Sequence, residues 1–115
     1  MRPDVLPMRL QRRILRNVTA EARRTLAIIR QCIEMDRYAL TAHFSERMVQ
    51  RGLFWSDVQL VIDEPQEVRS QGMDTYYRPK WIIRGEAATG DEIEIVCAVE
   101  IDETETEFIT LYWDD

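Results

Sequence analysis

The only histidine of the chain, His43, lies in a stretch whose spacing of apolar and polar residues predicts a short helix. At 100° per residue, Glu46, Arg47 and Gln50 fall on the same face of that helix within an arc of about 100°, and Arg51 borders them. A histidine in the first turn lies among unpaired backbone N–H groups at the positive end of the helix dipole. This position disfavours the protonated ring, so we expect a neutral imidazole that can accept a proton. The same N–H groups, with Arg47 one turn later, favour a bound phosphate or carboxylate.

The chemistry that suits this face is cleavage of a phosphodiester bond without a metal ion. His43 would accept the proton of a ribose 2′-hydroxyl or donate a proton to the leaving oxygen. Arg47 and Arg51 would stabilise the negative charge that grows on the phosphoryl oxygens. The reaction needs a second proton carrier, for which Glu46 and Tyr112 are candidates. In the alternative interpretation His43 only caps or packs the helix, and the arginines pair with acidic residues of the sheet.

The sequence lacks the residue spacings of a metal site. It has a single histidine, and its two cysteines, Cys32 and Cys97, are far apart. Zinc sites need closely spaced cysteines and histidines, and calcium loops need closely spaced acidic residues in a set pattern. The sequence has neither arrangement. We therefore expect no metal and no other cofactor, and two free, buried thiols in place of a disulfide.

Helices are expected in the first half of the chain. Thr19 is expected to cap a helix whose apolar residues recur at the spacing of one helical face. After a short strand over residues 37–40, Thr41 would cap the histidine helix. Gly52 would end that helix in the left-handed conformation that glycine adopts without strain.

Strands follow the helices. A capping-box pattern, S-D-V-Q, indicates that Ser56 begins a further short helix, which must stop before Pro65. Strands are then expected over residues 75–84, 92–101 and 107–113. This order predicts an α+β domain, with N-terminal helices packed on one face of an antiparallel β-meander.

The middle strand has the clearest alternation. Its odd-numbered residues are apolar and are expected to face the core, whereas the even-numbered face, which includes three glutamates, should be mostly exposed. The expected core residues are Ile93, Ile95, Cys97, Val99 and Ile101.

Charge is distributed unevenly along the chain. The net charge is −6, but residues 1–58 carry +5 and residues 59–115 carry −11. A polyanion would therefore meet the first half and be repelled by the second. We divide the chain into residues 1–18, a basic N-terminal tail or helix, and residues 19–115, a single domain. The sequence contains no membrane-spanning run and no secretory signal pattern, so we expect a cytoplasmic protein with no membrane partner.

The histidine segment resembles a known family. The stretch "DRYALTAHFSERMVQRGLFWSDVQLVIDEP" is similar to the core of the bacterial domain-of-unknown-function 4258 family, which shows a threonine-x-histidine start, an E-R-M and then an R-G. The matching positions are Thr41, His43, Glu46, Arg47, Met48, Arg51 and Gly52. The later "WIIRGEAATGDEIEIVCAV" and "FITLYW" resemble its hairpin and its final strand. The resemblance covers roughly residues 24–113.

That family is similar to small toxins of the RelE and BrnT kind. The resemblance therefore implies a RelE-like fold and a toxin-type ribonuclease, active or degenerate, which acts on RNA and is neutralised by a cognate antitoxin protein. The site residues it implies are His43, Arg47 and Glu46 for catalysis, and Thr41, Gln50, Arg51 and Tyr112 for substrate binding. This chain departs from such toxins in being acidic, which weakens attraction to RNA. The alternative function is a non-enzymatic module that binds a protein partner or an anion.

Overall fold

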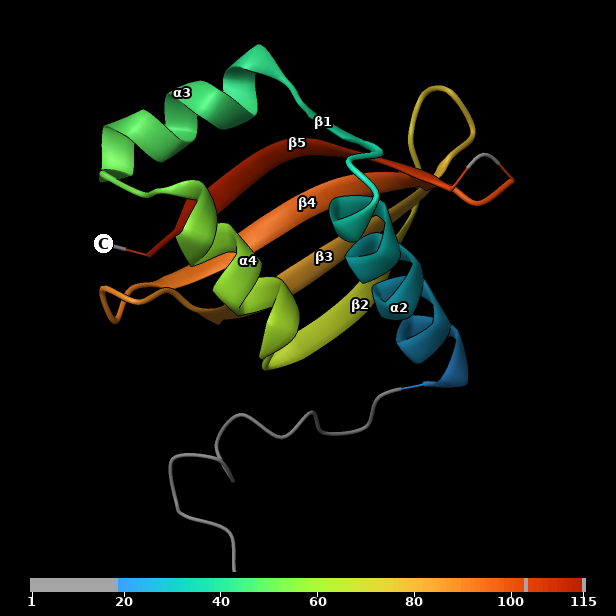
Figure 1. Ribbon diagram of the computed structural model, residues 1–115, viewed down its shortest axis with the longest axis horizontal. Coiled ribbons are helices and arrows are strands. Elements are labelled where there is room, and N and C mark those ends of the chain that lie inside the picture. Colours follow the sequence, from blue (N-terminus) through green and yellow to red (C-terminus); the bar gives the residue numbers. More distant parts are fainter. Residues whose placement is uncertain (1–18, 103, 115) are drawn as a thin grey trace, which may run out of the picture.

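The computed structural model describes residues 19–102 and 104–114, in which three helices precede most of a five-stranded sheet (Figure 1). The elements in chain order are α2 (Ala20–Glu34), β1 (Tyr38–Leu40), α3 (Ala42–Arg51), α4 (Trp55–Asp63), β2 (Glu67–Met73), β3 (Pro79–Glu86), β4 (Glu92–Glu100) and β5 (Glu105–Trp113). The α+β class predicted from the sequence is confirmed. The predicted division at residue 18 lies outside the described residues.

The sheet is mixed, in the order β1-β5-β4-β3-β2. Strands β2 to β5 form the predicted antiparallel meander, whereas β1 pairs in parallel with β5. The sequence did not predict β2. This edge strand is mostly exposed and has Val68 as its one buried residue, so it has no alternating pattern. Periodicity detects only strands that bury one face, which explains the omission.

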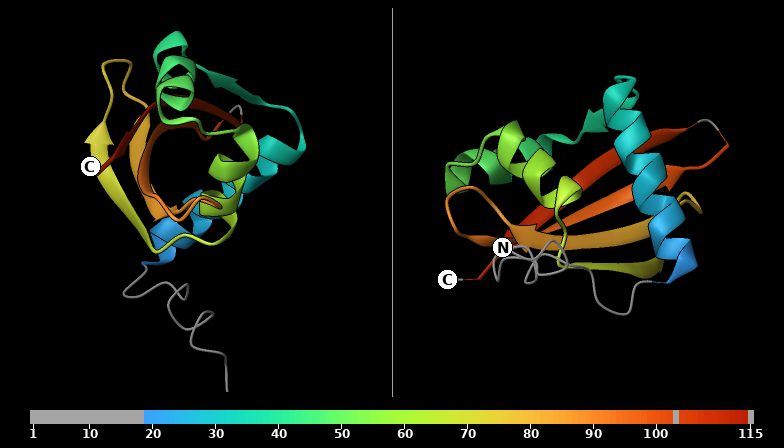
Figure 2. Two further views of the ribbon diagram at one scale, coloured as in Figure 1. Left: turned by 90° about the vertical axis from the view of Figure 1, so that its left-hand side faces the viewer. Right: turned by 60° about the horizontal axis from the view of Figure 1, so that its bottom comes forward.

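The helices lie on one side of a strongly curved sheet. Helices α2 and α4 cross its concave face, and α3 runs along the edge formed by β5 (Figures 1 and 2). A continuous apolar core joins the helices to the sheet. Its fully buried members include Ile29 of α2, Phe44 of α3, Val61 of α4, Ile95 of β4 and Phe108 of β5. None of the described helices is long and apolar enough to cross a membrane.

Two helices begin as predicted, and α3 also ends as predicted. The Thr19 hydroxyl accepts a hydrogen bond of 3.0 Å from the Ala22 N–H at the start of α2. The Thr41 hydroxyl caps α3 in the same way, accepting a 3.0 Å hydrogen bond from the Phe44 N–H. Gly52 ends α3 with a φ of 70°, which is the left-handed conformation.

Helix α4 does not begin at Ser56, so that prediction is wrong. It begins at Trp55, and its cap depends on Asp57, which is 4% exposed. One carboxylate oxygen accepts a 2.8 Å hydrogen bond from the Phe54 N–H, and the other accepts a 3.2 Å hydrogen bond from the Ala88 N–H. Asp57 therefore joins the start of α4 to the β3–β4 turn. The helix ends at Asp63, before Pro65 as predicted.

Strand β4 is buried on both faces. Its odd-numbered residues Ile93 to Val99 lie in the core as predicted, but the strand ends at Glu100 and leaves Ile101 53% exposed. On the opposite face, Val96 is 4% exposed, because Ile82 and Thr110 lie directly beside it in register. The prediction of a mostly exposed second face was therefore wrong at its centre.

The two cysteines, Cys32 and Cys97, are free and buried, as predicted. Burial raises the pKa of the Cys97 thiol to about 12. At neutral pH this thiol is therefore protonated, and it has little of the thiolate character that reactive cysteines need.

Strand β3 begins four residues later than predicted, because Asp74 organises residues 74–78 into a turn. Its carboxylate accepts hydrogen bonds from the Tyr76 N–H (2.9 Å), the Arg78 N–H (2.8 Å) and the Arg78 Nε (2.7 Å). Burial opposes ionisation of Asp74, but the hydrogen bonds from Arg78 and Tyr76 outweigh it and lower the pKa of the carboxyl.

Two substitutions can test whether Asp57, and not Ser56, caps helix α4. We expect Asp57→Ala to lower the free energy of unfolding by about 2 kcal/mol, because a helix cap and a turn hydrogen bond are both lost. Ser56 is exposed, so Ser56→Ala should change it by less than about 0.5 kcal/mol. Urea denaturation of the two variants measures the difference, and equal losses would contradict the assignment.

The lowered pKa of Asp74 makes a pH-dependent contribution to stability. The carboxyl of Asp74 binds a proton more readily in the unfolded chain than in the folded protein. Its contribution to the free energy of unfolding is therefore complete above the unfolded pKa of 3.8, and it is lost as the pH falls through the lower folded pKa. The difference in unfolding free energy between wild type and Asp74→Asn should therefore be larger at about pH 7 than at about pH 3. The exposed carboxylate of Asp63 provides a control as Asp63→Asn. A pH-independent difference for Asp74→Asn would refute the prediction.

Candidate functional site at the edge of β5

The site is built on a strand edge that no other strand covers along its whole length. Strand β1 pairs only with Thr106 to Phe108, and α3 lies beside the rest of β5 (Figure 1). The Thr41 hydroxyl donates a 2.6 Å hydrogen bond to the Ile109 carbonyl, and the Arg47 Nε donates a 3.0 Å hydrogen bond to the Leu111 carbonyl. Side chains of α3 thus satisfy edge carbonyls that a neighbouring strand would otherwise bind.

A bulge in β5 decides which side chains reach α3. Val96 pairs with Thr110 whereas the next residue, Cys97, pairs with Phe108, so Ile109 is an extra residue in the ladder. An extra residue reverses the alternation of side chains that follow it. Phe108 and Leu111 therefore both lie in the core, and Trp113 packs against the core.

Arg47 is anchored rather than mobile. Its guanidinium carbon lies 4.1 Å from the ring centroid of Trp113 and 5.5 Å from that of Tyr112. These contacts, together with the bond to the Leu111 carbonyl, hold the guanidinium plane against two aromatic rings. Within the described part of the chain, its two terminal nitrogens have no hydrogen-bond partner, so they are available to an anion.

Arg51 lies next to Arg47 but has a different partner. It forms a 3.2 Å ion pair with Asp91 of the β3–β4 turn, and its guanidinium carbon lies 5.5 Å from the ring centroid of Trp113. Trp113 is thus a shared aromatic platform for both arginines. Arg51 joins the end of α3 to the sheet, and an anion would have to compete with Asp91 for it.

His43 is the second residue of α3, and its side chain is exposed. Residues 19–102 and 104–114 provide it with no hydrogen bond or ion pair. The Thr41 cap fixes the helical turn that carries it, and Arg47 follows four residues later. The imidazole is therefore open to a ligand approaching the start of α3.

The remaining predicted residues are divided between two places. Glu46 and Gln50 are exposed on α3, and neither has a polar partner among the residues that the structure describes. Tyr112, which is 50% exposed, lies on β5 with its ring near Arg47. The structure thus brings Arg47 and Tyr112 together, and among the described residues neither side chain forms a hydrogen bond or an ion pair with Glu46 or Gln50.

Sequence reasoning missed Trp113 and Asp91. Trp113 comes under α3 only because of the bulge at Ile109, and no period in the sequence indicates that bulge. A hollow of about 90 Å³ beside these rings is lined by Tyr112, Trp113 and Arg84, among others. The described residues contain no cluster of three or more histidine, cysteine or acidic side chains that could hold a metal ion.

Comparison with known proteins identifies one family. The sequence profile of a family described as a domain of unknown function (DUF4258) matches residues 40–113, which is more than half of the chain. No curated protein and no solved structure matches the chain. The matched segment begins at the last residue of β1 and contains the whole of α3 and β5, and with them His43, Arg47 and Tyr112. The chain therefore belongs to the domain-of-unknown-function 4258 family.

Proposed function

We propose that the protein is a toxin-type ribonuclease of the RelE and BrnT kind, which cleaves RNA phosphodiester bonds without a metal ion. The observation that carries the proposal is the exposed, unpartnered imidazole of His43, one helical turn before an arginine with two available nitrogens. Thr41 and Arg47 have structural partners that account for their positions. The imidazole of His43 has none among the described residues, so a ligand can reach both of its ring nitrogens.

The reaction assigns one step to each group. His43 accepts the proton of the ribose 2′-hydroxyl, and the resulting oxygen attacks the adjacent phosphorus. The bond to the 5′-oxygen breaks, leaving a 2′,3′-cyclic phosphate and a 5′-hydroxyl that takes a proton from a second carrier. Arg47 stabilises the charge on the phosphoryl oxygens, and its anchoring on Trp113 orients it before the substrate arrives.

The second proton carrier is either Tyr112 or Glu46. Tyr112 is supported by its ring, which lies 5.5 Å from the Arg47 guanidinium carbon and is half exposed. Glu46 is supported by its position on the exposed side of α3. A cognate antitoxin would neutralise the enzyme by covering the start of α3, where His43 is open.

A second candidate function is a module that binds an anion or a protein carboxylate without cleaving it. The observation in its favour is that Arg51 is paired with Asp91 and the chain carries a net charge of −6. Acidic surfaces weaken attraction to a long polyanion, whereas a single phosphate or carboxylate at His43 and Arg47 is less affected.

Expression in bacteria tests the enzyme. Induction of the wild type should arrest growth and produce RNA fragments with 2′,3′-cyclic phosphate ends, and the purified protein should cleave single-stranded RNA in the presence of EDTA. His43→Ala should reduce cleavage by roughly 100-fold or more, since general acid–base catalysis contributes about that much. The matched control is Ser45→Ala, an exposed residue of the same helix, which should retain activity.

Two outcomes would decide against the enzyme. Harmless expression of folded wild type would reject ribonuclease activity. Binding of RNA or phosphate without cleavage, lost in His43→Ala, would support the module.

Stability measurements distinguish residues of the site that stabilise the fold from residues that only contact the substrate. His43→Ala should leave the midpoint of thermal unfolding unchanged, because the ring has no partner in the described residues. Arg47→Ala should lower the free energy of unfolding by about 2 kcal/mol, because the bond to the Leu111 carbonyl and the stacking on Trp113 are lost. A large loss in His43→Ala would instead show that the histidine holds the helix in place.

A further inference from the structure

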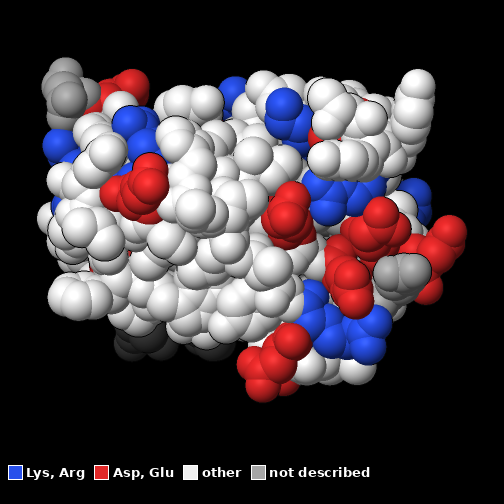
Figure 3. Space-filling model, turned by 90° about the horizontal axis from the view of Figure 1, so that it is seen from above, with Lys and Arg blue, Asp and Glu red and all other residues white. Residues whose placement is uncertain are grey.

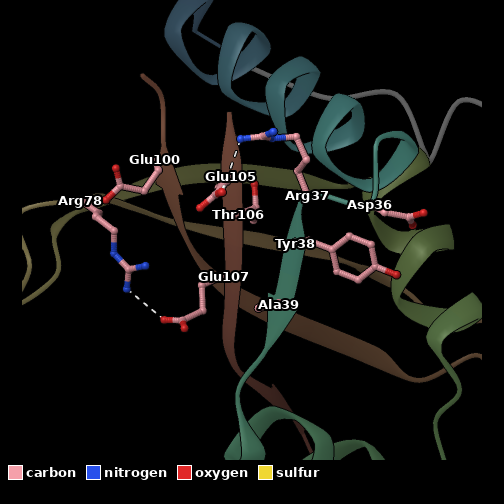
Figure 4. A pocket seen from close by; sticks show the side chains of 9 residues that line it. All are labelled: Asp36, Arg37, Tyr38, Ala39, Arg78, Glu100, Glu105, Thr106 and Glu107. Atoms are coloured by element: carbon pink, nitrogen blue, oxygen red, sulfur yellow. Dashed lines mark hydrogen bonds and ion pairs between the residues drawn. The ribbon is translucent and has the colours of Figure 1, made fainter. Parts of the chain in front are cut away.

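Two hollows lie away from His43, where the end of β4 and the start of β5 meet the turn before β3. One has a volume of about 470 Å³ and the other about 270 Å³, and both are lined by Arg78 and Glu100. We call the two together the sheet-end groove. The lining of the larger hollow includes Arg37, Ala39 of β1 and Glu107 of β5 (Figure 4).

The sheet-end groove has more carboxylates than cations. Its lining includes five acidic residues against Arg37 and Arg78, a net charge of −3. These are Asp36, Glu100, Asp102, Glu105 and Glu107. Figure 3 shows acidic side chains grouped between basic ones at this end of the molecule. The groove therefore attracts a basic ligand and repels a nucleic acid.

The two arginines do not neutralise all of this charge. Arg37 lies 3.4 Å from Glu105, and Arg78 lies 3.0 Å from Glu107 (Figure 4). Glu100 is directly opposite Glu105 in the β4–β5 register, and like charges in that arrangement repel. Glu100 has no polar partner among the described residues. A cation from outside the groove would relieve this repulsion.

Two aromatic side chains project beside the groove. Tyr76 and Tyr77 are 77% and 84% exposed, and the hydrogen bonds of Asp74 hold the turn that carries them. Tyr77 has a φ of 60°, a strained conformation for a non-glycine residue. A rigid turn that exposes two rings loses little conformational entropy when an apolar ligand covers it. The groove thus combines negative charge with an apolar contact surface.

We propose that the sheet-end groove is the docking site of the chain's own residues 1–18. This segment carries five arginines and one aspartate, a net charge of +4 that complements the groove. It also carries Leu6, Leu10, Ile14 and Val18, which suit the tyrosine rings. Residues 1–18 thus supply both the positive charge that complements the carboxylates and the apolar side chains that suit the tyrosine rings.

The chain is long enough for this contact. Residue 18 adjoins Thr19 at the start of α2, a helix of 15 residues that spans about 22 Å and ends close to Asp36. An extended segment of 18 residues reaches about 60 Å. The effective concentration of such a tethered segment is of millimolar order, so weak ion pairs suffice to hold it.

Limited trypsin digestion of the full-length protein tests the proposal. Mass spectrometry would follow cleavage after Arg9, Arg12, Arg13 and Arg16 at low and at high salt. Glu100→Lys should speed this cleavage at low salt by about fivefold or more, because digestion follows the undocked population. High salt should remove the difference, since it screens the ion pairs.

Two further variants sharpen the test. Tyr77→Gly removes the ring and the strained conformation together, and it should also speed cleavage at low salt. Glu86→Lys reverses an exposed charge at the other end of β3 and should have no effect. Equal cleavage rates in Glu100→Lys, Glu86→Lys and wild type would overturn the proposal. Protection that increases with protein concentration would also overturn it, because the segment would then bind a second copy. Circular dichroism of each variant checks that it is folded.

Discussion

The uncovered edge of β5 is the constraint on which the candidate site depends. Strand β1 pairs with only three residues of β5, so the carbonyls of Ile109 and Leu111 need other donors. The hydroxyl of Thr41 and the Nε of Arg47 supply them. These two bonds set the position of α3 along the strand and the direction in which its other residues face. The exposure of His43 follows from contacts made by its neighbours.

In the proposed function, structural and chemical roles are combined in one short helix. Arg47 uses one nitrogen and its flat face to hold α3 on β5, and it keeps two nitrogens for an anion. The imidazole of His43 forms no hydrogen bond or ion pair with the described residues. In such a site the arginine is already held in position before the substrate binds, so binding does not have to order its side chain. The proposed ribonuclease and the alternative anion-binding module share this geometry and differ only in whether protons are transferred.

The negative charge of the chain is not spread evenly over the surface of the folded protein. Much of the negative charge lies at the sheet-end groove, which is distinct from the start of α3. An anion approaching His43 meets Arg47 and Arg51, and a basic segment approaching Glu100 meets carboxylates and tyrosine rings. We therefore propose that the two surfaces bind ligands of opposite charge, so the net charge of −6 alone does not describe either of them.

Local rules within the sequence determined the α+β class, the threonine caps of α2 and α3, the glycine end of α3 and the core face of β4, because each depends on residues close together in the chain. The same rules identified His43 and Arg47 as neighbours on one helix. They misplaced the start of α4, where Asp57 accepts hydrogen bonds both from the nearby Phe54 N–H and from the Ala88 N–H across the fold. The sequence also could not reveal the parallel pairing of β1, the bulge at Ile109 or the packing of Arg47 on Trp113. The pairing of β1 and the contacts of Arg47 join residues 64 or more positions apart, and the bulge depends on how β5 pairs with β4. Only the tertiary structure decides such contacts.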